Sequence, residues 1–142
     1  MTPLCVDQGL GVIPWSPLAR GLLGGNRKRG DNTTSVRDEE DAPLADQLYD
    51  HPSDWDVVDA TMRVAEERGD QPAQVALAWL LSRPAVVAPI VGTTKLEQLE
   101  AAVAAVDMEL SDEECAELEA PYQAHDVRGW LSGPLQLPGV RS

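Results

Sequence analysis

The sequence has few cysteines, few basic side chains and no long apolar segment, and each scarcity excludes a class of protein. Its two cysteines, Cys5 and Cys115, lie far apart and form no CxxC pair, so neither a zinc site nor a disulfide framework is predicted. We expect both thiols to be reduced. No window reaches the roughly 18 apolar residues of a membrane span, and the first residues lack the basic region of a secretory signal. We therefore expect a cytoplasmic protein without a bound metal.

Basic residues are outnumbered by acidic ones, 11 against 24, which gives a formal net charge of −13. Such a charge repels nucleic-acid backbones and anionic lipid headgroups at long range, so we expect neither as a partner. Against this background Arg20, Arg27, Lys28 and Arg29 form a dense basic cluster. The cluster is either a site for a small anion or a solvated loop.

The apolar pattern predicts two short strands, at residues 10–15 and 86–91. Both are uninterrupted apolar runs of the kind that is buried on both faces of a parallel sheet. Pro14 should lie at the end of the first strand, because a proline in its middle would remove a hydrogen bond between strands. Residues 16–52 are rich in Gly, Asn, Asp and Pro and predict a long loop, with a turn of helix near residues 44–48.

Helices are predicted around these strands from caps and from three- and four-residue spacing. The first ends near residue 8 with Gly9 as its C′ residue, the second is capped by Ser53 and ended by Gly69, and the third begins at Asp70. A fourth covers residues 95–105, and a capping box of Ser111 and Glu114 starts a fifth over residues 111–120. The expected buried positions are, in chain order, Trp55, Val58, Met62 and Ala65, then Val75, Ala76, Trp79 and Leu80, then Leu96, Leu99, Val103 and Val106.

The order of these elements is that of βα units and predicts an α/β fold with two parallel strands and flanking helices. Two such strands alone make a poor sheet, because each expects buried neighbours on both edges. We therefore expect the chain to be an incomplete part of a larger fold.

Two segments carry residues suited to an anionic ligand. The first is WSPLARGLL, from Trp15 onward, directly after a strand, where an aromatic ring, a serine and glycines can meet a planar ring and an anion. The second is VGTTKLEQ, from Val91 onward, where a strand runs into the positive end of a helix. The alternative is that Trp15 belongs to the core, that the rest of the first segment is a turn, and that the second is an ordinary helix start.

Together these motifs resemble a known family. GLGVIPWSPLARGLLGG, PAQVALAWLLSRPAVVAPIVGTTKLEQLEAA, LSDEECAELEAP and PYQAH, in this order over residues 3–129, resemble the C-terminal part of aldo/keto reductases, especially the bacterial branch that is similar to potassium-channel β subunits. The resemblance implies part of a (β/α)₈ barrel of the TIM type over residues 1–129, with the motifs after strands seven and eight. Residues 130–142 would be an extended or disordered tail.

The resemblance also implies an oxidoreductase that uses NADP(H). Trp15 would stack on the nicotinamide, and residues 20–52 would fold over the cofactor. The pyrophosphate path would be lined by Ser16, Leu18, Arg20 and Gly21. The adenosine end would be held by Gly92, Thr93, Lys95 and Gln98, with Thr93 and Lys95 near the 2′-phosphate.

The sequence departs from the family pattern in two respects. Ala101 and Ala102 replace the Glu-Asn pair that commonly meets the adenine, and nothing corresponds to the catalytic tetrad of Asp, Tyr, Lys and His. The tyrosines and histidines of this chain do not match the tetrad positions; they are Tyr49, Tyr122, His51 and His125. We therefore expect no catalytic residue here, and no carbonyl reduction by this chain alone.

Three hypotheses follow from this pattern. The chain is part of a carbonyl-reducing enzyme, whose small carbonyl substrate would need the complete barrel. Alternatively, it binds NADP(H) without catalysis, or it is a scaffold that self-associates through open strand edges.

Overall fold

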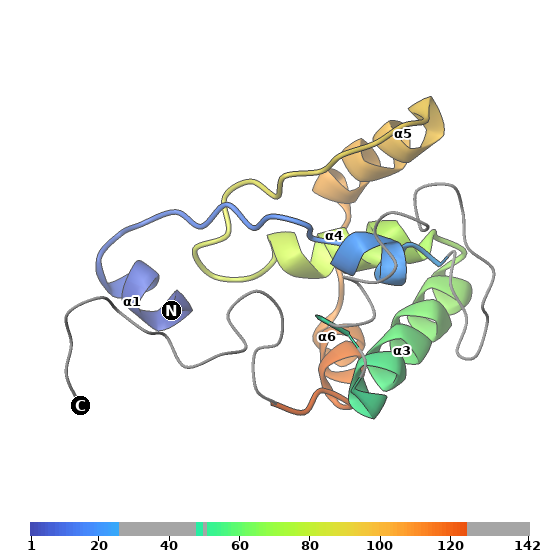
Figure 1. Ribbon diagram of the computed structural model, residues 1–142, viewed down its shortest axis with the longest axis horizontal. Helices are drawn as coiled ribbons and strands as arrows, with labels where there is room; N and C mark the ends of the chain where they lie inside the picture. Colours follow the sequence, from blue (N-terminus) through green and yellow to red (C-terminus); the bar gives the residue numbers. More distant parts are fainter. Residues whose placement is uncertain (26–47, 50, 125–142) are drawn as a thin grey trace.

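The computed structural model describes residues 1–25, 48–49 and 51–124, and its elements are helical (Figure 1). They are α1 (Thr2–Asp7), η1 (Ala19–Gly24), α3 (Pro52–Arg68), α4 (Pro72–Leu81), α5 (Leu96–Ala104), η2 (Ala105–Asp107) and α6 (Asp112–Glu119). Most of the predicted helical turn at residues 44–48, the basic residues Arg27, Lys28 and Arg29, His125 and the predicted tail lie outside the described residues.

The core lies where α3, α4 and α6 meet. Val64 and Ala65 of α3, Val75 of α4 and Leu118 of α6 are buried against one another, and Trp79, Met108 and Leu110 pack around them. Burying one large apolar side chain of this kind contributes about 1.5 to 3 kcal/mol. Of the predicted core positions in α3 and α4, half are fully buried and half are partly exposed. The buried ones are Val58, Ala65, Val75 and Ala76, and the partly exposed ones are Trp55, Met62, Trp79 and Leu80.

The predicted ends of two helices and the predicted start of a third are confirmed. Gly9 follows α1 with φ of 65°, and Gly69 ends α3 with φ of 73°, a left-handed conformation that glycine adopts without strain. At the start of α6 the Glu114 amide donates to Ser111 Oγ at 3.2 Å, and the Ser111 amide donates to Glu114 Oε2 at 2.7 Å.

The predicted N-cap of α3 is wrong by two residues, and that of α4 is wrong by one residue. His51, not Ser53, caps α3: the Ser53 amide donates to His51 Nδ1 at 3.3 Å, and the His51 amide donates to Asp54 Oδ2 at 3.1 Å. Gln71, not Asp70, precedes α4, and its amide donates to Gln74 Oε1 at 2.9 Å. In both helices a proline takes the first helical position, where its missing N–H is not needed, and this fixes the cap at the residue before it.

The two predicted strands run beside each other in parallel, as isolated bridges between Val12 and Val86 and between Trp15 and Ile90. The Val87 amide donates to the Val12 carbonyl at 3.0 Å, and the Ile90 amide donates to the Pro14 carbonyl at 2.9 Å. These segments form no continuous strand in the described part of the chain.

The expected burial of these segments on both faces is wrong. Ile13, Trp15, Val87 and Ile90 have 58%, 69%, 60% and 53% of their surface exposed. The reason is that the bridges join these two segments only to each other, within the described residues, so neither gains a neighbour on its other edge.

Helix α5 also differs from expectation. The predicted buried face of Leu96, Leu99, Val103 and Val106 is exposed, whereas Ala101 and Ala105 are buried. Helix α5 and η2 contact α4, and the small alanines permit this close approach. Figure 1 shows α5 standing out from the cluster of α3, α4 and α6.

Candidate functional site

The first motif turns sharply after the paired segment. Ser16, Ala19 and Arg20 have φ of 53°, 49° and 55°, and Gly21 has φ of 92°. Positive φ is uncommon for residues with a side chain, so three such residues in so short a stretch form a strained turn. Leu18 lies at the start of η1, and Leu22 anchors η1 by being buried next to α3 and α4.

This turn folds Arg20 back onto Trp15. The guanidinium carbon lies 5.2 Å from the centroid of the indole, within the range of a cation–π contact. The Arg20 amide donates to Ser16 Oγ at 3.3 Å, which ties the two ends of the turn together. Of the residues predicted to face the nicotinamide and pyrophosphate, the structure thus brings Trp15, Ser16 and Arg20 together.

Tyr49 interacts electrostatically with Arg20 of this turn, and no pattern in the sequence indicates this interaction. The pKa of its phenol is raised above the ordinary value of 10.0. Burial is the main cause; the positive charge of Arg20 opposes it, and the negative charge of Asp54 adds to it. Tyr49 matches no tetrad position, and no local spacing in the sequence links it to Arg20. Its electrostatic interaction with Arg20 depends on the tertiary fold, in which α3 contacts η1.

The second motif opens α5. Gly92 faces open space, Thr93 is partly buried, and Lys95 is the exposed N-cap residue of α5. The Gln98 side chain accepts a hydrogen bond from the Thr94 amide at 3.2 Å, so its oxygen closes the first turn of the helix. These residues leave a glycine backbone and an ammonium group accessible at the start of a helix.

The parallel pairing sets the relation between the two motifs. Because Trp15 pairs with Ile90, Ser16 and Gly92 both follow the same end of the pair. Beyond this point one segment continues to η1 beside α4, and the other continues to α5, as Figure 1 shows. The pairing therefore brings the beginnings of the motifs to one edge, while Lys95 and Gln98 lie farther along the second motif, at the N-cap and in the first turn of α5.

Comparison with known proteins identifies the family. Residues 1–123 match the aldo/keto reductase family. The chain belongs to this family.

Curated relatives support the assignment. The chain is 37% identical over 124 residues to a versiconal hemiacetal acetate reductase of Aspergillus parasiticus, with 86% of this chain and 35% of the relative covered. It is 38% identical over 111 residues to an uncharacterized oxidoreductase of Bacillus subtilis, covering 78% and 32%. A putative aryl-alcohol dehydrogenase of Schizosaccharomyces pombe is 35% identical over 134 residues, covering 91% and 35%. The chain thus spans about a third of the length of these relatives.

Aldo/keto reductases have a (β/α)₈ barrel and generally use a nicotinamide dinucleotide, so the residues here can be tested for fit to that ligand. The exposed indole of Trp15 offers a planar surface, and Arg20 and Lys95 offer positive charges. Nothing lies within 4 Å of the position that a Cβ would take at Gly21 or Gly92, so both backbones are open to approach. This set of groups fits a ring joined to phosphates.

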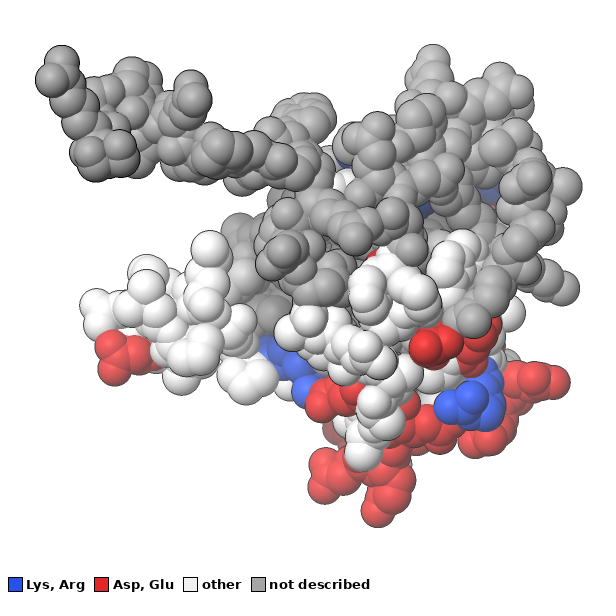
Figure 2. Space-filling model, turned by 60° about the horizontal axis from the view of Figure 1, so that its bottom comes forward, with Lys and Arg blue, Asp and Glu red and all other residues white. Residues whose placement is uncertain are grey.

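A hollow elsewhere does not fit the cofactor of an aldo/keto reductase. It lies between α3 and α6, has a volume of about 430 Å³, and is lined by Asp56, Asp59, Ala60, Arg63, Glu117, Ala120 and Pro121. Its three carboxylates outnumber its single guanidinium and would repel phosphates. Figure 2 likewise shows Asp and Glu side chains gathered along one part of the visible surface.

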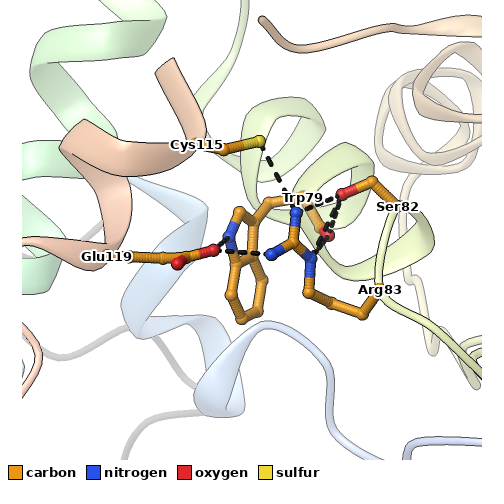
Figure 3. Close-up of polar contacts among 5 residues, drawn as sticks. All are labelled: Trp79, Ser82, Arg83, Cys115 and Glu119. Carbon is orange, nitrogen blue, oxygen red and sulfur yellow. Dashed lines mark hydrogen bonds and ion pairs between the residues drawn. The ribbon is translucent and has the colours of Figure 1, made fainter. Parts of the chain in front are cut away.

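A second arginine–tryptophan pair joins α4 to α6 and has a structural role. Arg83 lies over the Trp79 ring at 4.8 Å, and Glu119 Oε1 accepts from Trp79 Nε1 at 2.9 Å and from an Arg83 Nη at 2.6 Å (Figure 3). The other Nη of Arg83 also contacts Cys115 Sγ at 3.6 Å, and both cysteines are free thiols.

Within the described residues, no three His, Cys, Asp or Glu side chains cluster as a metal site, and no helix is long and apolar enough to cross a membrane.

Proposed function

We propose that this chain supplies the cofactor-binding part of an NADP(H)-dependent aldo/keto reductase. The paired segments would correspond to barrel strands seven and eight, and the sequence would belong to the bacterial branch of the family, which is similar to potassium-channel β subunits. The observation that carries the proposal is the parallel pairing of Trp15 with Ile90, since it directs both motifs from one end of a strand pair. The free thiols are compatible with a cytoplasmic location.

In this proposal each motif holds one part of the dinucleotide. Trp15 stacks on the nicotinamide ring, and Ser16, Leu18, Arg20 and Gly21 follow the pyrophosphate. Gly92, Thr93, Lys95 and Gln98 hold the adenosine end, with Lys95 near the 2′-phosphate. When bound, the reduced nicotinamide would be the source of hydride for a small carbonyl substrate, and the residues of this chain would orient the cofactor without supplying a proton donor.

The test is the cofactor affinity of Lys95→Ala. Removing the ammonium should weaken NADPH binding about tenfold and leave NADH binding nearly unchanged, because NADH lacks the 2′-phosphate. Fluorescence titration of the full 142-residue chain measures both affinities. Arg63→Ala is the matched control, because it removes a positive charge that pairs with Glu117 in the acidic hollow. An unmodified chain that binds neither nucleotide, or an equal loss of both in Lys95→Ala, contradicts the proposal.

A self-associating scaffold is the second candidate, and one observation favours it. The apolar face of α5, formed by Leu96, Leu99, Val103 and Val106, is exposed, and an uncovered apolar face invites association. Sedimentation velocity over a range of concentrations distinguishes the candidates: dimers without nucleotide binding support the scaffold, and monomers that bind NADPH support the cofactor role.

A further inference from the structure

Arg20 and Trp15 form a contact that the predicted phosphate role of Arg20 does not require. The guanidinium carbon lies 5.2 Å from the indole centroid, while 69% of the Trp15 surface is still exposed. A cation on the ring leaves indole surface available for a second planar group. The same guanidinium that would approach a phosphate thus already touches the aromatic ring.

The backbone between the two residues is strained in a way that maintains this contact. Ser16, Ala19 and Arg20 all have positive φ, although none is a glycine. The hydrogen bond from the Arg20 amide to Ser16 Oγ closes the turn. Backbone strain of this kind persists where the surrounding contacts fix it, and it is concentrated at ligand-binding segments.

We propose that Arg20 is a positioning residue that holds the indole of Trp15 for the nicotinamide ring and favours the reduced form of the cofactor. This inference rests on the proposed function, in which Trp15 stacks on the nicotinamide. Two physical effects combine. The cation–π contact restricts the orientations of the indole, so a larger fraction of molecules is ready to stack. The positive charge beside the ring disfavours the cationic nicotinamide of NADP⁺, but not the neutral ring of NADPH.

The test compares the affinities of the two redox forms in Arg20→Met. Loss of the contact should lower the affinity for NADPH about two- to fivefold more than the affinity for NADP⁺, because a lost phosphate contact lowers both affinities alike and leaves their ratio unchanged. A residue that only contacts phosphates would lose both forms equally, because their phosphates are the same, and an equal loss would overturn the proposal. Arg20→Lys keeps the charge and should retain part of the preference for NADPH; complete loss of the preference in Arg20→Lys would argue against the role of the charge.

A double-mutant cycle tests whether Arg20 acts through Trp15. With Trp15→Ala in place, the guanidinium is no longer held beside the ring, so Arg20→Met should change the ratio of the two affinities less than it does in the unmodified chain; an undiminished change would show that Trp15 does not place the charge and would overturn the positioning role. Arg83→Met is the matched control, because it removes the other arginine–tryptophan contact and should leave the ratio unchanged. Circular dichroism verifies that each variant is folded. If the unmodified chain binds neither form, the proposed function itself fails; if it binds and Arg20→Met keeps the ratio, the positioning role alone fails.

Discussion

Two regions of the molecule differ in how far their apolar side chains are buried. One is the cluster of α3, α4 and α6, and the other consists of the paired segments together with α5. In the cluster, Val75 has no exposed surface and Leu118 only 7%. In the other region, Ile13, Val87 and Leu96 each have more than half of their surface exposed, although the apolar pattern of the sequence predicts that all of these segments are buried.

Ion pairs also join the helices of the cluster. Arg63 pairs with Glu117 and Arg68 with Glu114, which joins α3 to α6, and Arg83 with Glu119 joins the end of α4 to α6. Exposed pairs of this kind contribute little each, but they cover a closed apolar core. The cluster is therefore held by its own contacts, whereas the motifs proposed to bind the cofactor lie in the region whose apolar surface is exposed.

Removing a leucine from each region should have the largest and most unequal effects on stability. Leu118→Ala leaves a cavity in the core and should lower the free energy of unfolding by about 2 to 5 kcal/mol. Leu96→Ala, the matched control on α5, removes the same atoms from a side chain that is 67% exposed and should change it by less than about 0.5 kcal/mol. Urea unfolding followed by circular dichroism measures both. Similar losses in the two variants would mean that the α5 face is covered in solution.

A smaller loss of stability is expected from adding a methyl group between the paired segments. At Gly11 a Cβ would lie 2.9 Å from Val87 Cγ1 and 3.0 Å from Cγ2, and the stiff valine cannot easily move away. Gly11→Ala should therefore weaken the pairing by about 1 kcal/mol and speed hydrogen exchange at the Val87 and Ile90 amides. Gly92→Ala is the control, because its Cβ would meet nothing within 4 Å. Unchanged exchange in Gly11→Ala would show that the segments are not in contact there.

The local fold could be predicted from the sequence where adjacent residues decide it. The Ser111 and Glu114 capping box and the glycine ends of α1 and α3 depend on residues within one turn of a helix. The caps at His51 and Gln71 were missed because serine and aspartate have the stronger cap preference, whereas the position of the next proline decides the start. For α5, periodicity indicated which residues share a face but could not tell whether anything covers it.

The candidate site could be predicted only in part. The position of the two motifs after two apolar segments was visible in the sequence, and the parallel pairing of those segments follows the prediction. The contact of Arg20 with Trp15 was not visible, because it depends on positive φ at Ser16, Ala19 and Arg20, which residue preferences do not favour. Tyr49 was missed for a different reason: its electrostatic interaction with Arg20 depends on the tertiary fold and not on local spacing.

The smallest expected effect concerns the ionic border of the cluster. Hydrogen bonds from the Arg68 side chain and the Ser111 amide lower the pKa of Glu114 below its ordinary value of 4.5. Because the pKa is lower in the folded state, ionised Glu114 stabilises the fold above pH 4.5, and this contribution is lost as the pH falls through the lowered value. Glu114→Gln should therefore reduce stability at pH 7 by less than about 1 kcal/mol and flatten its dependence on pH below 4.5. Urea unfolding at several pH values measures both effects. In an Arg68→Met background, where the main partner of Glu114 is gone, Glu114→Gln should have a smaller effect, and an undiminished effect would show that the ion pair between α3 and α6 does not cause the pH dependence.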